Sequence, residues 1–333
     1  MLELYPWQRD QWRRFLSMQK QNRLPHALLL TGNKGLGLPE FSEKIAQHLL
    51  CLNLTEENTP CGVCQSCQLF DAGNHPDFQS IEPEEAGKQI KVTQVRELIE
   101  FMTLKSFTAR NKIVTLCPAE AMNRSTANAL LKTLEEPPAQ SMLILISHQP
   151  ERLPVTIRSR CQQIEFQPAT DQQTIEWLEE QGIQTEYSID LLLHLTGGAP
   201  LSVIEMLEND ILDERESVVT DIESIIKNQA NPVELAGRWE SLGCERIIIW
   251  LMRFCQDMVL IKLMNNEARI INRDLSARLA NIAQKLDLSR IMRLYGFLQV
   301  KYRESTAQTN YNSLSLLEEI IIYWNNPEQV EQS

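Results

Sequence analysis

The sequence lacks an excess of basic residues. Its 32 lysines and arginines are outnumbered by 44 aspartates and glutamates, which gives a formal net charge of −12. A protein that binds nucleic acid without regard to sequence needs a basic face that displaces counterions from the phosphates. The composition therefore argues against that class of protein, and we expect mainly protein partners.

Signals for export or membrane insertion are also missing. The stretch from Met1 to Asp10 has no basic segment followed by an apolar one, so no signal peptide is predicted. The most apolar long stretch, Ile247–Met264, is interrupted by Arg253, Asp257 and other polar residues, and it predicts a buried helix. We expect a cytoplasmic protein without a membrane partner, whose eight cysteines are reduced unless they bind metal.

A third absence concerns nucleotide chemistry. Residues 32–39 read Gly-Asn-Lys-Gly-Leu-Gly-Leu-Pro, between an apolar, strand-like run and a helical pattern. In a working loop of the form G-x-x-x-x-G-K-[ST], the lysine reaches the β- and γ-phosphates and the hydroxyl holds Mg²⁺. Gly32, Gly35 and Gly37 keep the backbone turn. Leu38 and Pro39 replace the lysine and the hydroxyl, although Pro39 suits a first helical turn.

The acidic residues that hold Mg²⁺ in such enzymes are missing as well. They follow a later strand, but the strand predicted at Lys112–Leu116 ends in Cys117-Pro118. Glu120, two residues further on, is expected to be a surface or capping carboxylate, and Lys34 a surface residue. Because three nucleotide-handling groups are absent together, we predict neither intrinsic ATPase activity nor tight ATP binding.

Four cysteines form a cluster with metal-ligand spacing, C-x9-C-x2-C-x2-C. Four thiolates complete tetrahedral Zn²⁺ and leave no position for water, so a structural zinc ion is predicted at Cys51, Cys61, Cys64 and Cys67. An iron–sulfur cluster uses the same ligands, and unliganded reduced thiols are the remaining alternative. The other cysteines are expected to pack in the core: Cys117, Cys161, Cys244 and Cys255.

The hydrophobic pattern changes near residue 167. Before it, strands alternate with helices, which predicts an α/β domain with a mostly parallel sheet. Strands are predicted at 24–31, 78–82, 112–116, 142–146 and 164–166, and helices at 39–52, 93–106 (with Thr93 as N-cap) and 125–136. After it, short helices at 170–181, 188–195 and 200–208 precede a region with a persistent 3.6-residue period.

Two further motifs point to a family. Residues 127–138 read Ala-Asn-Ala-Leu-Leu-Lys-Thr-Leu-Glu-Glu-Pro-Pro, and residues 156–161 read Thr-Ile-Arg-Ser-Arg-Cys. Both resemble signatures of DNA-polymerase clamp-loader subunits, AAA+ proteins that open a sliding clamp onto DNA. With its cysteine cluster and eroded loop, the chain is most similar to the δ′ type of bacterial DNA polymerase III.

The resemblance implies a role for the Ser-Arg-Cys motif. In the family this motif supplies an arginine finger to ATP bound on the neighbouring subunit, so Arg160, with Ser159 and Cys161, inherits that role. Without the motif, a structural ion pair would be the default for Arg160. For Arg152 and Arg158, a solvated or structural role is expected. The family's γ-phosphate sensor and lid arginine are replaced by Ser147-His148 and by Leu201.

The resemblance also implies an architecture and partners. It gives an AAA+ core at 1–167 carrying the cysteine module at 51–67, a three-helix lid at 168–208, and a C-terminal helical collar for oligomerisation at 209–333. The partners implied are γ/τ-type ATPase subunits and the δ subunit. The clamp and primer–template DNA would be met mainly through the complex, as part of a DNA polymerase holoenzyme.

Three functions are thus in competition. The first is a non-catalytic clamp-loader subunit that offers Arg160 to a neighbour. The second is a divergent but active γ/τ-like ATPase motor, which needs a substitute for the phosphate lysine that the sequence does not offer. The third is a zinc-dependent nucleic-acid-binding module, which the acidic charge and the lack of an aromatic and basic stripe beside the cysteines weaken.

Overall fold

The computed structural model describes residues 4–85, 87–107, 111–264, 270–306 and 312–325. Contacts divide the chain into two compact units, Met1–Gln184 with Thr196–Val203, and Thr185–Leu195 with Ile204–Ser333. The sequence suggested three parts, a core, a lid and a collar. That three-part division remains a prediction. In the described residues no single helix is long and apolar enough to cross a membrane; one bent pair, Ile189–Leu195 with Pro200–Glu208, meets the criteria of length and composition jointly.

The first unit is built on a five-stranded parallel sheet. Its strands are β1 (Ala27–Thr31), β2 (Phe78–Ile81), β3 (Lys112–Leu116), β4 (Ser141–Ser147) and β5 (Gln162–Glu165). They lie in the order β2-β3-β4-β1-β5, and every pairing is parallel. Central β1 and β4 are buried along their whole length, because apolar side chains alternate between two covered faces.

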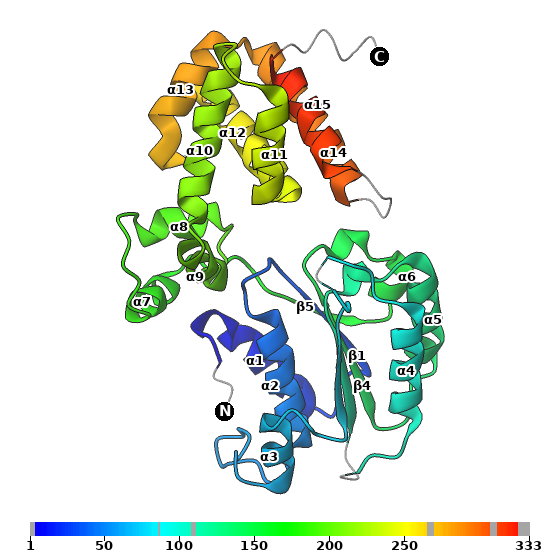
Figure 1. Cartoon of the computed structure of the whole chain (residues 1–333). Coiled ribbons are helices and arrows are strands. Elements are labelled where there is room, and N and C mark those ends of the chain that lie inside the picture. The colour runs from blue at the N-terminus through cyan, green and yellow to red at the C-terminus, as the bar shows by residue number, and fades with distance from the viewer. Residues whose placement is uncertain (1–3, 86, 108–110, 265–269, 307–311, 326–333) are drawn as a thin grey trace. The chain divides into compact units, whose positions relative to one another are not determined.

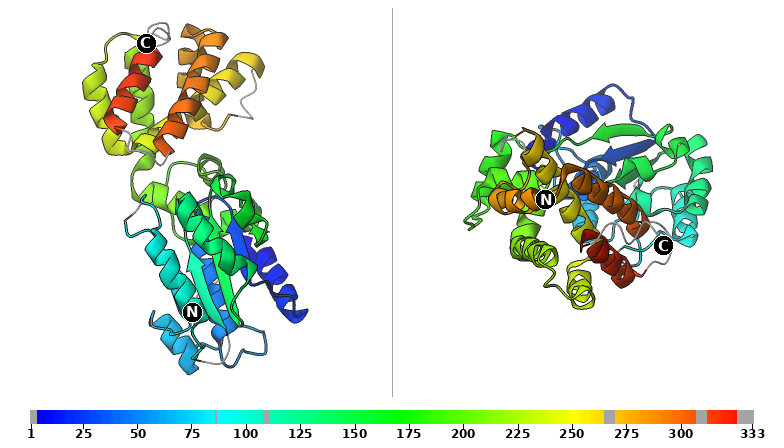
Figure 2. Two further views of the ribbon diagram at one scale, coloured as in Figure 1. Left: turned by 90° about the vertical axis from the view of Figure 1, so that its right-hand side faces the viewer. Right: turned by 90° about the horizontal axis from the view of Figure 1, so that it is seen from above.

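Helices cover both faces of this sheet (Figure 1 and Figure 2). Leu28 and Leu30 of β1 point to the face covered by α1 (Arg9–Lys20) and α2 (Leu38–Leu50). Leu29, between them, points to the face covered by α4 (Val92–Thr103) and α5 (Arg124–Glu135). The remaining elements of this unit are η1 (Pro6–Gln8), α3 (Gln65–Asp71), η2 (Ala119–Ala121), η3 (Pro150–Arg152), α6 (Val155–Arg158) and α7 (Gln172–Glu180).

Helices are the only regular secondary structure among the described residues of the second unit. A single apolar core includes Trp239, Phe254 and Trp324, each with none of its surface exposed. The apolar stretch predicted to be a helix, Ile247–Met264, lies in α12 (Cys244–Met264). The other elements are α8 (Ile189–Leu195), α9 (Pro200–Glu208, whose first turn belongs to the first unit), α10 (Ile211–Ile226), α11 (Pro232–Leu242), η5 (Arg273–Leu275), α13 (Ser276–Lys285), α14 (Leu288–Thr306) and α15 (Ser313–Asn325).

The parallel sheet and the helical second unit confirm the predicted fold class. One local prediction is wrong: Thr93 does not cap α4. The helix begins at Val92 with Lys91 as its N-cap, and the side chain of Gln94 accepts a hydrogen bond from the Lys91 N–H at 2.9 Å. Hydrophobic periodicity gives the buried face of a helix, but it does not fix its first residue.

Candidate functional site

The eroded loop lies between β1 and α2 with the backbone shape that its glycines predicted. Gly35 and Gly37 have φ values of 87° and 75°, in the left-handed region that favours glycine. Leu38, at the position of the phosphate lysine, begins α2 and is completely buried in the core. Pro39 occupies the first helical turn, as predicted.

Neighbouring segments cover the carbonyl groups of this loop. The Trp7 indole N–H donates to the Leu36 carbonyl at 3.0 Å, and the Gln8 amide donates to the carbonyls of Leu36 and Gly37 at 2.8 and 2.7 Å. Trp7 is itself held between Tyr5 and Trp177, with ring centroids 4.9 and 5.0 Å away. The aromatic segment at 5–8 is therefore an ordered part of the loop's surroundings.

The start of α9 closes the loop from another side. The Leu201 N–H donates to the Gly35 carbonyl at 3.1 Å, and the Ser202 hydroxyl donates to the Lys34 carbonyl at 3.1 Å. The Asn33 amide donates to the carbonyl of Gly197 at 2.9 Å. Leu201, where the family has its lid arginine, thus contributes a backbone hydrogen bond to the loop. These bonds tie the phosphate-loop remnant to residues more than a hundred positions away.

Gly35 is the tightest point of this closure, and we expect Gly35→Ala to be strongly destabilising. A Cβ atom there would lie 2.1 Å from the Ser202 hydroxyl and 2.7 Å from the Ser202 backbone nitrogen. Left-handed backbone strain costs about 1–2 kcal/mol and overpacking about 1–3 kcal/mol, so the free energy of unfolding should fall by about 2–5 kcal/mol in a denaturant titration.

Gly182→Ala is the matched control for this prediction. Gly182 has a similar φ of 70°, but apart from its chain neighbours no atom of the described residues lies within 4 Å of the added Cβ. The control should lose only about 1–2 kcal/mol, from backbone strain alone. Equal losses in both variants would show that the contact between the loop and Ser202 is not tight.

The carboxyl edge of the sheet beside the loop is negatively charged. Glu120 of η2 accepts a hydrogen bond from the His148 N–H at 3.0 Å and so caps the end of β4, one of the roles expected for it. Burial, together with Glu82, Glu120 and Glu40, raises the pKa of Cys117 to about 12. Three carboxylates therefore lie close enough to Cys117 to disfavour its thiolate.

Arg160 lies on the same domain, outside the loop, and is about one-third exposed. Its Nη2 lies 2.6 Å from Oε1 of Glu135, and its Nη1 donates to the Thr156 carbonyl at 3.0 Å. The guanidinium therefore takes part in an ion pair, the structural role weighed from the sequence, while part of its surface stays open. Ser159 is exposed, and burial raises the pKa of Cys161, which packs against the core, to about 12.

The other arginines near the motif are more exposed. Arg158 lies at the end of α6, and Arg152 donates to the side chain of Gln149 at 3.0 Å. Lys34 in the loop is exposed, as predicted. Among the remaining cysteines, Cys244 and Cys255 are buried in the core of the second unit, and Cys117 and Cys161 are half-buried against the cores of the first.

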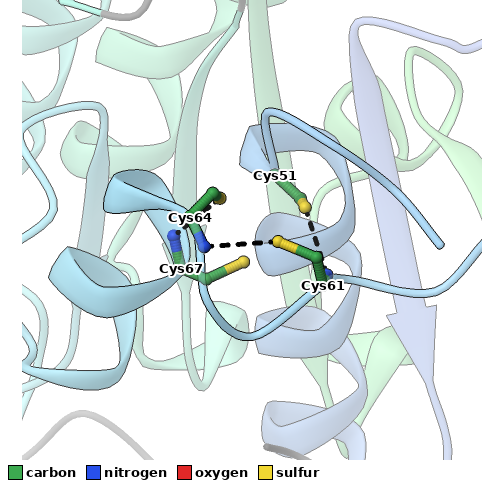
Figure 3. A group of neighbouring side chains, drawn as sticks. All are labelled: Cys51, Cys61, Cys64 and Cys67. Carbon is green, nitrogen blue, oxygen red and sulfur yellow. Dashed lines mark hydrogen bonds between the residues drawn. The ribbon is translucent and has the colours of Figure 1, made fainter.

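The four clustered cysteines converge as their spacing predicted (Figure 3). Cys51 ends α2, Cys61 lies in the following loop, Cys64 caps α3 and Cys67 lies within it. Their sulfur atoms all lie within 4.8 Å of one another. Four sulfurs bound at about 2.3 Å to one tetrahedral ion lie about 3.8 Å apart, so a small closure of the cluster accommodates zinc.

Backbone N–H groups already point at these sulfurs. The N–H groups of Cys61, Cys64 and Cys67 donate to the sulfurs of Cys51, Cys61 and Cys64 at 3.3, 3.3 and 3.4 Å. Burial works against ionisation of Cys64, but N–H donors of Cys67 and Leu52 outweigh it and lower its pKa to about 6. Such donors stabilise thiolates, which are the form that binds metal.

A buried polar chain that the sequence did not indicate joins this module to the sheet. The Ser66 hydroxyl of α3 donates to the Leu50 carbonyl at 2.7 Å and lies 2.8 Å from Nε2 of His75. Nδ1 of His75 accepts from the Asp77 N–H, and the Asp77 carboxylate lies 3.3 Å from the Lys112 ammonium at the start of β3. No spacing rule links these residues, so sequence reasoning had no signal for them.

Comparisons with known proteins agree over most of the chain. The family described as DNA polymerase III, delta subunit, matches residues 7–170, and its C-terminal family matches 209–326. The δ′ subunit of DNA polymerase III from Pseudomonas aeruginosa is 34% identical over 97% of this chain and 98% of its own, and that from Escherichia coli is 29% identical over 88% and 86%.

More distant matches come from related subunits. The tau/gamma subunit of Haemophilus influenzae is 36% identical over 46% of this chain and 22% of its own. A solved gamma subunit-related protein of Thermotoga maritima covers 93% of this chain and 98% of its own, at 17% identity and a TM-score of 0.46. The two family models and the Pseudomonas aeruginosa subunit together match this chain over most of its length. The chain therefore belongs to the family of δ′ subunits of DNA polymerase III.

Proposed function

We propose that the chain is a non-catalytic subunit of a DNA polymerase III clamp loader. It scaffolds the ring of ATPase subunits and offers Arg160 in trans to ATP bound on a neighbouring γ/τ-type subunit. A guanidinium supplied in this way neutralises charge on the transferring phosphoryl group. The chain's contribution to hydrolysis then lies at the neighbour's site.

One observation carries the proposal: the loop that would serve ATP in cis is closed, while the motif that would serve ATP in trans is kept at the surface. Leu38 is buried where a lysine should reach phosphates, and Trp7, Gln8 and Ser202 bond to the loop's carbonyls. Arg160 keeps about a third of its side chain exposed. A non-catalytic subunit of this kind does not need to bind ATP itself, but it needs the arginine that acts on a neighbour's ATP.

The remaining parts fit the same role. The helices from α10 to α15 share one core and would form the collar that meets the γ/τ-type and δ subunits. The cysteine cluster would hold a structural zinc ion, with Cys51, Cys61, Cys64 and Cys67 as its four ligands. Contacts with the clamp and primer–template DNA would be made mainly by the assembled complex, given the net charge of −12.

The proposal predicts that the isolated chain does not bind ATP tightly, because the loop lacks the lysine and its carbonyls are bonded to Trp7, Gln8 and Ser202. Equilibrium binding of labelled ATP with Mg²⁺ should show no saturation at micromolar concentrations. Added to γ/τ-type and δ subunits, the same preparation should raise their DNA-stimulated ATPase rate. An isolated γ/τ-type subunit, which should bind ATP, is the positive control.

Two outcomes would contradict this prediction. ATP turnover by the isolated chain would favour the divergent ATPase motor instead. A salt-dependent gel shift of DNA by the isolated chain, together with no effect on the partner ATPase, would favour the nucleic-acid-binding module.

A further inference from the structure

The contacts of Arg160 single out a second residue, Glu135. This carboxylate lies at the last position of α5, and α5 packs against α6, which supplies the other contact through the Thr156 carbonyl (Figure 1). The guanidinium is therefore held at two points by two different helices. Neither contact depends on a residue next to Arg160 in the sequence.

The backbone beneath both contacts is fixed. Leu134, beside Glu135, is 3% exposed, and Ile157, beside Thr156, is completely buried in the same core. Helix α5 ends at Glu135 because Pro137 and Pro138 follow, and proline cannot continue a helix. The backbone of Glu135 is thereby placed where its carboxylate can meet Arg160.

Without Arg160, an acidic side chain at the C-terminal end of α5 would be unfavourable. The C-terminal end of a helix carries partial negative charge, so an acidic residue in the last turn is disfavoured and a basic one is preferred. The positive charge of Arg160 compensates Glu135 there. This pairing contributes little to folding, because the two side chains are 35% and 52% exposed and water weakens ion pairs of this kind.

What the pair does provide is orientation. A free arginine side chain samples many rotamers, and its planar guanidinium must be aligned to bind a phosphoryl group. A guanidinium has five N–H donors, and the described contacts with Glu135 and Thr156 use two of them. The others remain for phosphate oxygens, so Arg160 can engage a neighbour's nucleotide without leaving Glu135.

We infer that Glu135 is a positioning residue for Arg160, one that holds the guanidinium in the orientation needed to reach ATP on a neighbouring subunit. This inference rests on the proposed function, because it assumes that Arg160 acts in trans. Glu135 itself touches no nucleotide. Its removal should therefore lower the rate of the chemical step through Arg160 and leave the affinity for ATP, which is bound by the neighbour, unchanged.

A double-mutant cycle in the reconstituted complex tests the inference. Glu135→Ala should lower kcat of the DNA-stimulated ATPase by about threefold to tenfold, since misplacing a catalytic group by about 1 Å can cost up to 10²-fold. KM for ATP should stay unchanged. Glu135→Gln, which keeps an oxygen acceptor, should retain most of the rate. In the Arg160→Ala background, Glu135→Ala should have no further effect.

Glu136→Ala is the matched control, because Glu136 is the next residue, is also exposed, and makes no hydrogen bond or ion pair with Arg160 among the described residues. It should behave as wild type. If Arg160→Ala is fully active, the proposed finger is wrong. If Arg160→Ala is impaired but Glu135→Ala is fully active, faster than wild type, or equally harmful in both backgrounds, the finger stands and the positioning role is wrong.

Discussion

Replacing Arg160 by alanine should slow ATP hydrolysis at the neighbouring site by roughly 10³–10⁵-fold, the usual contribution of an arginine finger. That factor corresponds to about 4–7 kcal/mol of activation free energy. The loss should fall on hydrolysis and clamp loading and not on assembly, because the Arg160–Glu135 pair is half-exposed and contributes little to stability. Single-turnover hydrolysis in the reconstituted complex, with assembly checked by gel filtration, measures both.

Arg158→Ala is the control for this prediction. Arg158 carries the same charge two residues earlier, at the end of α6, and is exposed. The control should hydrolyse ATP at close to the wild-type rate, which would exclude a general loss of positive charge as the cause. A full rate for Arg160→Ala in an intact complex would leave the arginine with a purely structural role as the partner of Glu135.

Much of the fold was predictable because short runs of apolar residues indicate the individual strands and helices. The strand predicted at Lys112–Leu116 has those bounds in the structure, and the apolar run at 142–146 became β4, Ser141–Ser147. Such runs are buried on both faces of a parallel sheet, and burial leaves a continuous apolar signature. Helix ends were less certain, as Thr93 shows, because capping depends on single side chains such as Gln94.

The chemistry of the site was only partly predictable. The cysteine cluster and the eroded loop follow from spacing within a short segment, so the sequence indicated both. The contacts of Trp7 and Ser202 with the loop, and of Glu135 with Arg160, join residues from 25 to 168 positions apart. Nothing local marks such pairs, because the fold alone brings them together.

The second large effect should come from the cysteine cluster. Replacing Cys64 by serine should abolish stoichiometric zinc binding and lower the free energy of unfolding of the first unit by about 4 kcal/mol or more, a size typical of the loss of a metal site. The segment between Cys51 and Cys61 contains no described helix or strand, and α3 has only seven residues. Helices of that length are not stable alone, so the metal would supply their order.

The loss should spread beyond the module through Ser66. Its hydroxyl contacts His75, which accepts from the Asp77 N–H, and Asp77 is completely buried beside Lys112. Once α3 is displaced, this buried ion pair loses part of its surroundings, and a buried charge with weakened partners is strongly destabilising. Hydrogen exchange should therefore increase in β2, at Phe78–Ile81, as well as in the cysteine segment.

Cys244→Ser is the control that separates loss of the metal from the loss of a thiol as such. Cys244 is buried in the second unit, away from the cluster in the sequence, so this variant should keep one zinc ion per chain. Metal analysis and thermal unfolding, with and without a chelator, test both variants. A wild-type chain that contains no metal and is insensitive to chelator would mean reduced thiols, and visible absorbance from iron would mean an iron–sulfur cluster. If the chain contains no metal, order in the segment from Cys51 to Cys67 would have to arise from packing and the Ser66–His75 contact.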